Sequence, residues 1–169
     1  MVHDIADDDW LLGSGLGAAL DEMAARGLVF DALTRPQHLS RLLRVCHRHP
    51  GLTVVVDHIS KPLIRERRLD PWRDGLAAIA ECPNAFCKLS GVVTEAANGW
   101  TIDELRPYVD HVLRVFGAER VLWGSDWPVC TLTATYQQWV DAALALTKNA
   151  KPADREKLFA KNAERVYRV

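Results

Sequence analysis

The chain has 169 residues, of which 49% are hydrophobic and 25% are charged, and its formal net charge is −1. This length is enough for one ordinary hydrophobic core, and no apolar run approaches the roughly 18–20 residues that span a bilayer. Nucleic acid is not an expected partner, because phosphate binding normally needs a basic excess. The acidic start of the chain, residues 2–9, is unlike a secretory leader. We therefore expect a cytoplasmic protein that does not bind membranes.

Four segments are rich in apolar and β-branched residues and predict strands, at residues 28–33, 52–56, 85–89 and 120–123. A helical pattern over residues 15–26 precedes the first strand, and helical periodicity follows each of the four. The helix-start signals are Pro36, Asp70 as N-cap before Pro71, the capping box of Thr101 and Glu104, and Pro152 for a last helix. A further helix carries an apolar face through Tyr136 and Trp139.

Strands that alternate with helices predict a parallel α/β sheet, because each return crossover requires a helix. No linker or low-complexity segment divides the sequence, so we expect a single domain over residues 1–169. The four cysteines show no CxxC spacing, which favours reduced core thiols over a structural zinc site.

Three polar side chains follow predicted strands where the strands end. His58 follows the second strand, Ser90 the third and Asp126 the fourth. The carboxyl ends of parallel strands lie on one side of a sheet, so these side chains are expected to converge. Asp57 and His58 alternate in direction while the strand lasts, so only one of them faces the site.

A converging histidine and aspartate suit two kinds of chemistry. They can bind a divalent metal, or the aspartate can act as general base on water while the histidine polarises a carbonyl. Each residue also has a structural interpretation, His58 as a hydrogen-bonded histidine and Asp126 as a turn acceptor before Pro128. Ser90 has no adjacent base and no GxSxG motif, which argues against a serine nucleophile.

Two charged residues, Asp31 and Lys88, lie within apolar strands, where an unpaired charge is costly. Either they pair inside the structure, or an edge position exposes them to solvent.

In combination, three segments resemble the amidohydrolase-related family, in the branch that includes sugar lactonases and 2-pyrone-4,6-dicarboxylate lactonase. They are Asp57-His58 with Lys61-Pro62, Cys87-Lys88-Leu89-Ser90-Gly91, and Gly124-Ser125-Asp126-Trp127-Pro128. The resemblance covers the chain from about Trp10 onward. It implies a distorted (β/α)8 barrel with the site at the carboxyl ends of its strands.

By this resemblance, Asp126 activates the hydrolytic water, and His58 binds a metal or the substrate carbonyl. Ser90 and Trp127 are then expected near a small-molecule substrate. Some members of the family use a divalent metal, so zinc or manganese held by His58 and Asp126 is one possibility, and catalysis without metal is the other. The expected reaction is hydrolysis of a small lactone, sugar-derived or carboxylated; the sequence does not distinguish cleavage of a lactone from cleavage of an amide.

The sequence departs from the family in length. A full barrel takes about 250 residues, and no His-x-His pair precedes the first predicted strand. We therefore expect a partial TIM barrel of about four C-terminal βα units with a parallel sheet and a C-terminal helix, weak or inactive by itself. Four strands cannot close, so the prediction is a homodimer, a complementing N-terminal half-barrel, or a truncated or split reading frame, of which the last is favoured.

Two alternatives to the hydrolase are considered. One is a non-catalytic half-barrel that assembles with itself or with an N-terminal-half partner. The other is a small doubly wound nucleotide-binding domain, which the absence of GxGxxG and GxxxxGK motifs disfavours.

Overall fold

The computed structural model describes residues 5–169; residues 1–4, part of the acidic start of the chain, lie outside it. Its four strands are β1 (Val29–Ala32), β2 (Thr53–Val56), β3 (Ala85–Leu89) and β4 (Val121–Trp123). They form one parallel sheet in the order β1-β2-β3-β4. All four predicted strands and their parallel pairing are confirmed.

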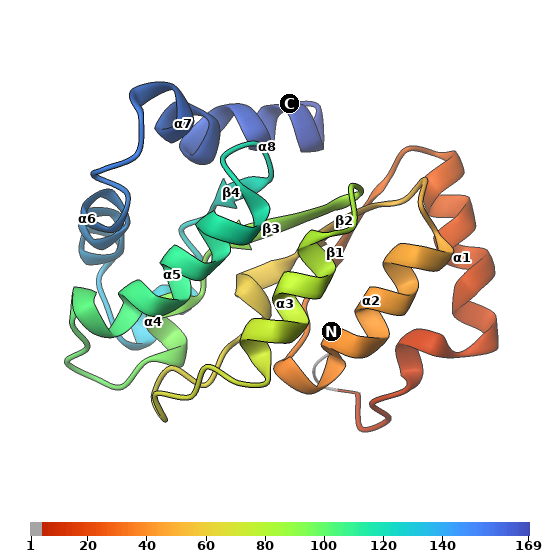
Figure 1. Ribbon diagram of the computed structural model, residues 1–169, viewed down its shortest axis with the longest axis horizontal. Helices are drawn as coiled ribbons and strands as arrows, with labels where there is room; N and C mark the ends of the chain where they lie inside the picture. The colour runs from red at the N-terminus through yellow and green to blue at the C-terminus, as the bar shows by residue number, and fades with distance from the viewer. Residues whose placement is uncertain (1–4) are drawn as a thin grey trace.

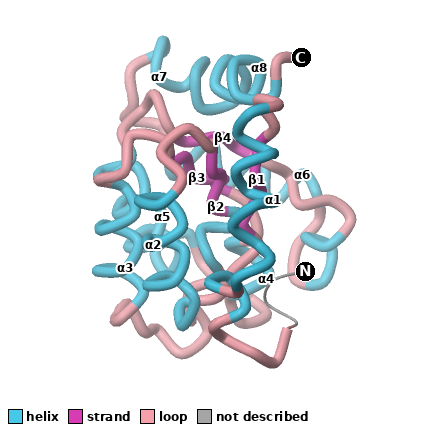
Figure 2. The backbone as a smooth tube through the Cα atoms, turned by 90° about the vertical axis from the view of Figure 1, so that its right-hand side faces the viewer, coloured by secondary structure: helices cyan, strands magenta, loops and turns pink. Residues whose placement is uncertain are grey.

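Helices alternate with the strands along the chain, as the sequence pattern predicts. They are α1 (Ser14–Ala25), α2 (Leu39–Arg48), α3 (Trp72–Ala80), α4 (Val92–Glu95), α5 (Ile102–Phe116), α6 (Tyr136–Leu146), α7 (Pro152–Glu156) and α8 (Asn162–Tyr167). In Figure 1, α2, α3 and α5 lie in front of the sheet, α1 and α6 flank it, and α7 and α8 close one end. In Figure 2, α2, α3 and α5 form a layer on one side of the strands, and α6 lies on the other side.

Three predicted helix starts are correct and one is wrong. Pro36 begins a short 3₁₀ helix, Pro36–His38, that leads into α2, and Pro152 is the first residue of α7. The Thr101 side chain accepts from the Glu104 backbone N–H and the Glu104 carboxylate accepts from the Thr101 N–H, which is the expected capping box. Asp70, by contrast, does not cap α3, whose N-cap is Pro71 without a side-chain cap bond. The Asp70 carboxylate instead accepts a hydrogen bond from the Arg73 guanidinium at 3.0 Å.

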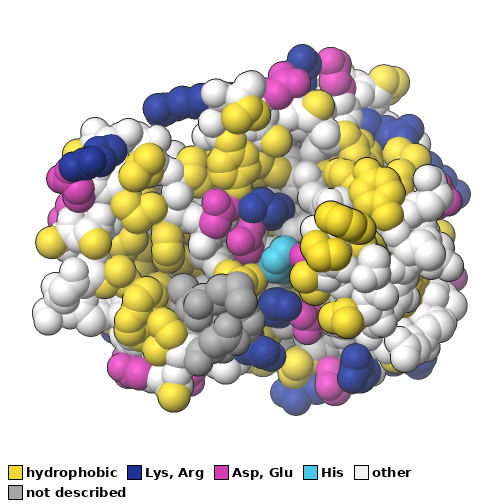
Figure 3. Space-filling view, turned by 180° about the vertical axis from the view of Figure 1, so that it is seen from behind, with side chains coloured by type: hydrophobic (Ala, Val, Ile, Leu, Met, Phe, Trp, Pro, Cys, Tyr) yellow, Lys and Arg dark blue, Asp and Glu magenta, His cyan; other side chains and the backbone are white. Residues whose placement is uncertain are grey.

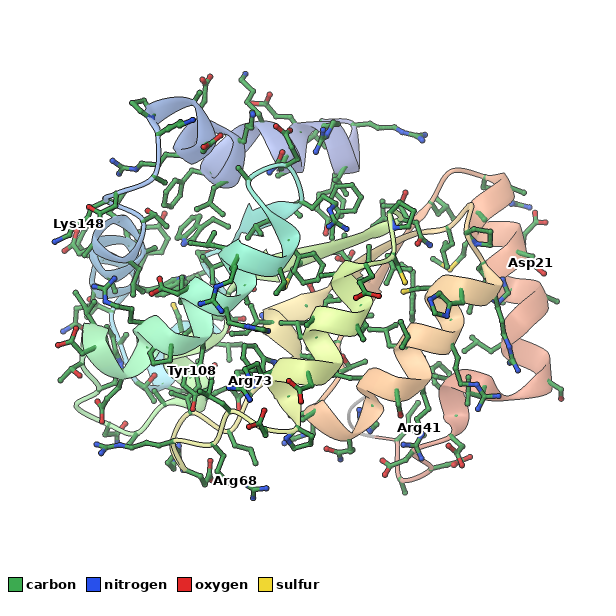
Figure 4. All side chains as sticks on the ribbon, in the orientation of Figure 1. Asp21, Arg41, Arg68, Arg73, Tyr108 and Lys148 are labelled. Carbon is green, nitrogen blue, oxygen red and sulfur yellow. The ribbon has the colours of Figure 1, made fainter. Side chains whose placement is uncertain are left out.

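The sheet has two unlike faces. On the helix-covered face, apolar strand residues pack with helices α2, α3 and α5 in the main core; they are Val54, Val56, Ala85, Cys87, Leu89 and Val121. The opposite face, called the open face below, carries Asp31, Val55, Lys88 and Leu122, and α8 covers part of it through Val166 and Tyr167. The polar side chains of Asp21 on α1, Arg41 on α2 and Lys148 in the turn after α6 point away from the sheet (Figure 4).

All four cysteines are buried and free, as predicted. Within residues 5–169, no helix has the length and apolar character needed to cross a membrane.

Candidate functional site

The carboxyl ends of β2, β3 and β4 bring the three predicted polar side chains together. His58 Nδ1 lies 2.8 Å from Ser90 Oγ, a hydrogen bond in which either atom can donate. On the other side of the imidazole ring, Nε2 lies 3.6 Å from Asp126 Oδ1. His58 therefore bridges a serine and an aspartate that are distant from it in sequence. The predicted convergence is present in the structure.

The backbone that carries His58 is strained. His58, Ile59, Ser60 and Lys61 all have positive φ angles, of 50°, 47°, 60° and 47°. Such a conformation costs roughly 1–2 kcal/mol for each residue that is not glycine. It persists only where the surrounding structure holds it, and it is frequent at functional sites. This left-handed turn, residues 58–61, is what directs the His58 ring toward Ser90 and Asp126.

Neighbouring side chains hold the left-handed turn. Ser60 is buried and its Oγ lies 2.8 Å from Thr34 Oγ1, at the end of β1. Gly91 leaves the space that His58 needs, since a Cβ built on Gly91 would lie 2.7 Å from His58 Cβ. Lys61 pairs with Glu95 at 2.7 Å. The position of His58 thus depends on residues that follow two other strands, Thr34 after β1 and Gly91 and Glu95 after β3.

Asp126 also sits at a strained position, with a φ of 56°. Its side chain is 9% exposed, and that of His58 is 20% exposed. Burial raises the pKa of Asp126 although the nearby imidazole opposes the shift, and burial lowers the pKa of His58 although Asp126 opposes it. A carboxylate whose proton affinity is raised is better suited to act as a general base near neutral pH.

A second charged group lies on the open face, where the sequence left two possibilities for Asp31 and Lys88. Lys88 Nζ contacts Asp31 Oδ1 at 2.9 Å and Asp57 Oδ1 at 2.6 Å, so the residues pair. The Tyr167 hydroxyl donates to Asp31 at 2.5 Å. Burial would lower the pKa of Lys88, but its bonds to Asp57, Tyr167 and Asp31 outweigh burial and raise it. Asp57 therefore faces Lys88 while His58 faces Asp126.

This group shows what sequence reasoning missed. Tyr167 was not expected to contact a strand residue, because nothing in the spacing links the last helix to β1. One signal for Lys88 was available in the sequence: Lys88 and Ser90 are two residues apart, so in an extended strand their side chains leave the same face of the sheet.

Figure 3 views the face opposite to that of Figure 1. It shows acidic, basic and histidine side chains near its centre with hydrophobic side chains on both sides.

The two predicted substrate-contacting residues differ in exposure. Ser90 is 1% exposed, with its hydroxyl against His58. Trp127 follows Asp126 and is 66% exposed. Three other exposed apolar residues lie in the loop after β4 or just beyond it, namely Val129, Leu132 and Tyr136. Trp127 thus belongs to an exposed apolar segment that begins beside Asp126.

His58 and Asp126 have the geometry for two positions of a metal site. Two ligands of a tetrahedral zinc ion, with bonds of about 2.0–2.2 Å, lie roughly 3.4 Å apart. The observed separation of His58 Nε2 and Asp126 Oδ1 is 3.6 Å. The bond between His58 Nδ1 and Ser90 is of the kind that orients a metal-binding histidine. Residues 5–169 hold no group of three or more His, Cys, Asp or Glu side chains arranged for a metal ion.

Comparison with known proteins gives the family. A family model described as amidohydrolase matches residues 2–169. The chain is 40% identical to an L-fucono-1,5-lactonase of Burkholderia ambifaria, and 34% identical to one of Burkholderia multivorans. The match covers 100% and 86% of this chain, and 60% and 53% of those proteins. The chain belongs to the amidohydrolase family.

Solved structures agree with this assignment. A crystal structure of a Burkholderia multivorans amidohydrolase with bound zinc has a TM-score of 0.95 at 30% identity, covering 99% of this chain and 62% of that one. A 2-pyrone-4,6-dicarboxylic acid hydrolase of Pseudomonas putida, described as putative, has a TM-score of 0.74 at 22% identity, with 97% and 59% covered, and supports the fold alone. These neighbours are TIM-barrel amidohydrolases, and the chain spans about 60% of their length. The predicted partial barrel is confirmed.

Proposed function

We propose that this chain carries the catalytic aspartate and a histidine of a hydrolase for a small sugar lactone. The observation that carries the proposal is the approach of His58 Nε2 to Asp126 Oδ1, at 3.6 Å, across two parallel strand ends. Two relatives named L-fucono-1,5-lactonase, 40% and 34% identical, support a sugar lactone as the substrate class. Ser90 and Trp127 are the proposed substrate-side residues.

In the proposed reaction, Asp126 takes a proton from a water molecule whose oxygen attacks the lactone carbonyl carbon. The bond between that carbon and the ring oxygen then breaks, and the ring oxygen takes the proton held by Asp126 to become a hydroxyl group, which restores the carboxylate. The product is an open hydroxy acid. The raised pKa of Asp126 favours its part in this reaction, because the carboxylate binds the water proton more readily.

The role of His58 depends on its tautomer. If Nδ1–H donates to Ser90 Oγ, Nε2 has a free electron pair and can bind a divalent metal such as zinc or manganese. If the Ser90 hydroxyl donates to Nδ1, Nε2–H can donate to the lactone carbonyl, and no metal is needed. A metal held by His58 and Asp126 would polarise the carbonyl or acidify the water. The zinc found in the Burkholderia multivorans structure supports the first arrangement.

We further propose that residues 1–169 form one domain, located in the cytoplasm, where reduced thiols such as the four free, buried cysteines persist. By itself the chain is expected to hydrolyse lactones slowly, because it spans 60% and 53% of the two lactonases that it matches.

The test uses a chimera in which this chain replaces the matching region of the Burkholderia ambifaria lactonase. Hydrolysis of L-fucono-1,5-lactone and related sugar lactones is followed by acid release, for the chimera and for the chain alone. The expected result is hydrolysis by the chimera and little by the chain. A folded chimera without activity on any sugar lactone would contradict the proposed function. A chain as fast as the complete lactonase would contradict the expected weakness of the isolated chain.

Metal use is tested on the same chimera. After treatment with a chelator, activity is expected to fall and to return with zinc or manganese, and His58→Ala should lower zinc affinity in a calorimetric titration. A matched control is His47→Ala, since His47 is exposed on α2. Full activity in a metal-free chimera would instead support the arrangement in which Nε2–H contacts the carbonyl.

A second candidate function is a non-catalytic half-barrel that assembles with itself or with a complementing half. It is favoured by the two edges of the sheet, because β1 and β4 each pair with only one strand among the described residues. Light scattering of the purified chain separates the candidates. A dimer, or a complex with the N-terminal part of the Burkholderia ambifaria lactonase, supports assembly, and a stable monomer with neither contradicts it.

A further inference from the structure

Both strained turns of the candidate site lie against a buried tryptophan. The indole Nε1–H of Trp72 donates to the carbonyl oxygen of Ile59 at 2.6 Å, inside the left-handed turn that carries His58. The indole Nε1–H of Trp139 donates to the carbonyl oxygen of Gly124 at 2.9 Å, two residues before Asp126. Trp72 is 1% exposed and Trp139 is 0% exposed. Each tryptophan thus donates a hydrogen bond to the backbone beside one proposed catalytic side chain.

The two tryptophans occupy equivalent places in the fold. Trp72 is the first residue of α3, the helix that follows β2, and Trp139 is in the first turn of α6, the helix that follows β4. In a βα unit the helix runs antiparallel to its strand, so its first turn lies beside the carboxyl end of that strand. A long side chain with one rigid donor at this place can reach the turn that leaves the strand.

The two turns that carry His58 and Asp126 have disfavoured backbone angles and need stabilising contacts. His58 and Asp126 have φ angles of 50° and 56°, where residues other than glycine are disfavoured. A hydrogen bond to one carbonyl oxygen orients the peptide plane and so restrains the adjoining dihedral angles. An indole is suited to this, because its ring is locked by packing; Trp72 lies 5.5 Å from Tyr108 and Trp139 lies 6.4 Å from Trp123, measured between ring centroids.

We infer that Trp72 and Trp139 are positioning residues, which hold His58 and Asp126 at their separation of 3.6 Å by anchoring the two strand-end turns. The catalytic meaning of this inference rests on the proposed function. Its structural content does not, because the turns and their anchors can be measured without any substrate. Neither tryptophan is proposed to contact the lactone or a metal.

The test is NMR spectroscopy of the full chain with the single variants Trp72→Phe and Trp139→Phe, which keep an aromatic ring and remove the donor. A strong amide–Hα cross-peak within one residue marks a positive φ, and the ring nitrogen shifts of His58 report its tautomer. Trp72→Phe is expected to weaken these cross-peaks at residues 58–61 and to shift the His58 ring nitrogens. Trp139→Phe is expected to weaken the cross-peak at Asp126 and to leave residues 58–61 unchanged.

The matched control is Trp100→Phe, which removes an indole donor that bonds Thr133 at 3.2 Å, outside both turns. It should leave the signals of His58 and Asp126 as they are in the wild type. Unchanged turn signals in the folded Trp72→Phe and Trp139→Phe variants would overturn the inference. So would equal disturbance of both turns by all three variants, since that is the result of a general loss of packing.

A measurement on the wild-type chain covers the case in which a variant does not fold. The indole N–H groups of Trp72 and Trp139 should exchange with solvent at least about tenfold more slowly than that of the 66% exposed Trp127. Exchange as fast as that of Trp127 would overturn the inference. An inactive chimera would contradict the proposed lactonase function but not the positioning role of the two tryptophans. Failure of the proposed function and failure of this inference are therefore distinguishable.

Discussion

On the helix-covered face of the sheet, Val54, Val56, Cys87 and Leu89 are fully buried beneath helices that this chain itself supplies. The open face instead carries Lys88 between Asp31 and Asp57, and those three side chains are 24%, 39% and 14% exposed. Burial of apolar surface is the main favourable term in folding, whereas partly exposed ion pairs contribute little. The comparison indicates that the helix-covered face contributes to stability and that the open face contributes little to it.

The carboxyl edge of the sheet resembles the open face in this respect. At this edge, His58 and Asp126 both have left-handed backbone conformations, and their imidazole and carboxylate groups lie largely buried next to each other. Positions that are unfavourable for stability and are held by neighbours are typical of functional sites. The contrast between the two faces can be tested by substitutions that separate activity from stability.

The largest effect is expected from Asp126→Asn in the chimera. Loss of the general base should lower kcat by about 10²–10⁴-fold. Stability should be unchanged or higher, because burial disfavours the Asp126 carboxylate and raises its pKa. Acid release and urea unfolding measure the two quantities. Asp103→Asn, at a side chain that is 94% exposed, is the control and should keep full activity. A large loss of stability in Asp126→Asn would place this residue among the structural ones.

The next effect is expected from Leu76→Ala beneath the helix-covered face. Leu76 is 0% exposed, so its truncation leaves a cavity and should lower the free energy of unfolding by about 2–5 kcal/mol. Leu132→Ala, at a residue that is 74% exposed, should change it by less than about 0.5 kcal/mol. Urea denaturation followed by circular dichroism gives both values. Equal effects would mean that burial on this face does not dominate stability.

Lys88→Met tests the open face. It leaves Asp31 and Asp57 without their cation, and should cost about 1–3 kcal/mol of unfolding free energy at pH 7. The loss should stay below that of Leu76→Ala, because the charged group is partly exposed. Lys148→Met, on the exposed surface after α6, is the control and should be near neutral. A cost above that of Leu76→Ala would reverse the proposed division between the two faces.

The smallest effect concerns a buried imidazole in the helical layer. His111 Nε2–H donates to the Arg73 carbonyl oxygen at 2.9 Å, and burial lowers the His111 pKa. A histidine with a lowered pKa stabilises the fold fully above its unfolded pKa of about 6.5, and this contribution is lost as pH falls through 6.5 toward the folded value. One such group changes stability by at most about 1.4 kcal/mol per pH unit.

His111→Gln should therefore flatten the loss of unfolding free energy between pH 7 and pH 5. The exposed His47 serves for comparison, and His47→Gln should leave the slope as it is. An unchanged slope in His111→Gln would show that folding does not lower the pKa of His111.

Much of the architecture was predictable because local patterns encode it. The apolar runs at residues 53–56 and 85–89 and the Thr101–Glu104 capping box each involve residues near one another in sequence. The convergence of His58, Ser90 and Asp126 followed from one rule, that carboxyl ends of parallel strands share an edge. Asp70 was assigned wrongly as a cap, because its residue type suits that place but its carboxylate binds the Arg73 side chain instead.

Other features of the site were not predictable from the sequence. No local pattern marks four successive left-handed residues in His58-Ile59-Ser60-Lys61, since none of them is a glycine. The sequence pattern predicts Trp72 and Trp139 as core residues of amphipathic helices. The hydrogen bonds that their indole N–H groups donate become visible only when each helix is placed beside the end of its strand.

By itself, the sequence determined the four strands, their parallel direction and the three residue types that meet at the strand ends. Periodicity and chain direction suffice for these, because they depend on backbone geometry alone. Only the tertiary structure decided which ring nitrogen of His58 faces Asp126, that Lys88 lies between Asp31 and Asp57, and that two indoles anchor the strained turns. The physical reason is that hydrogen bonds and ion pairs act over about 3 Å, and residues 13 to 68 positions apart reach that range only after packing.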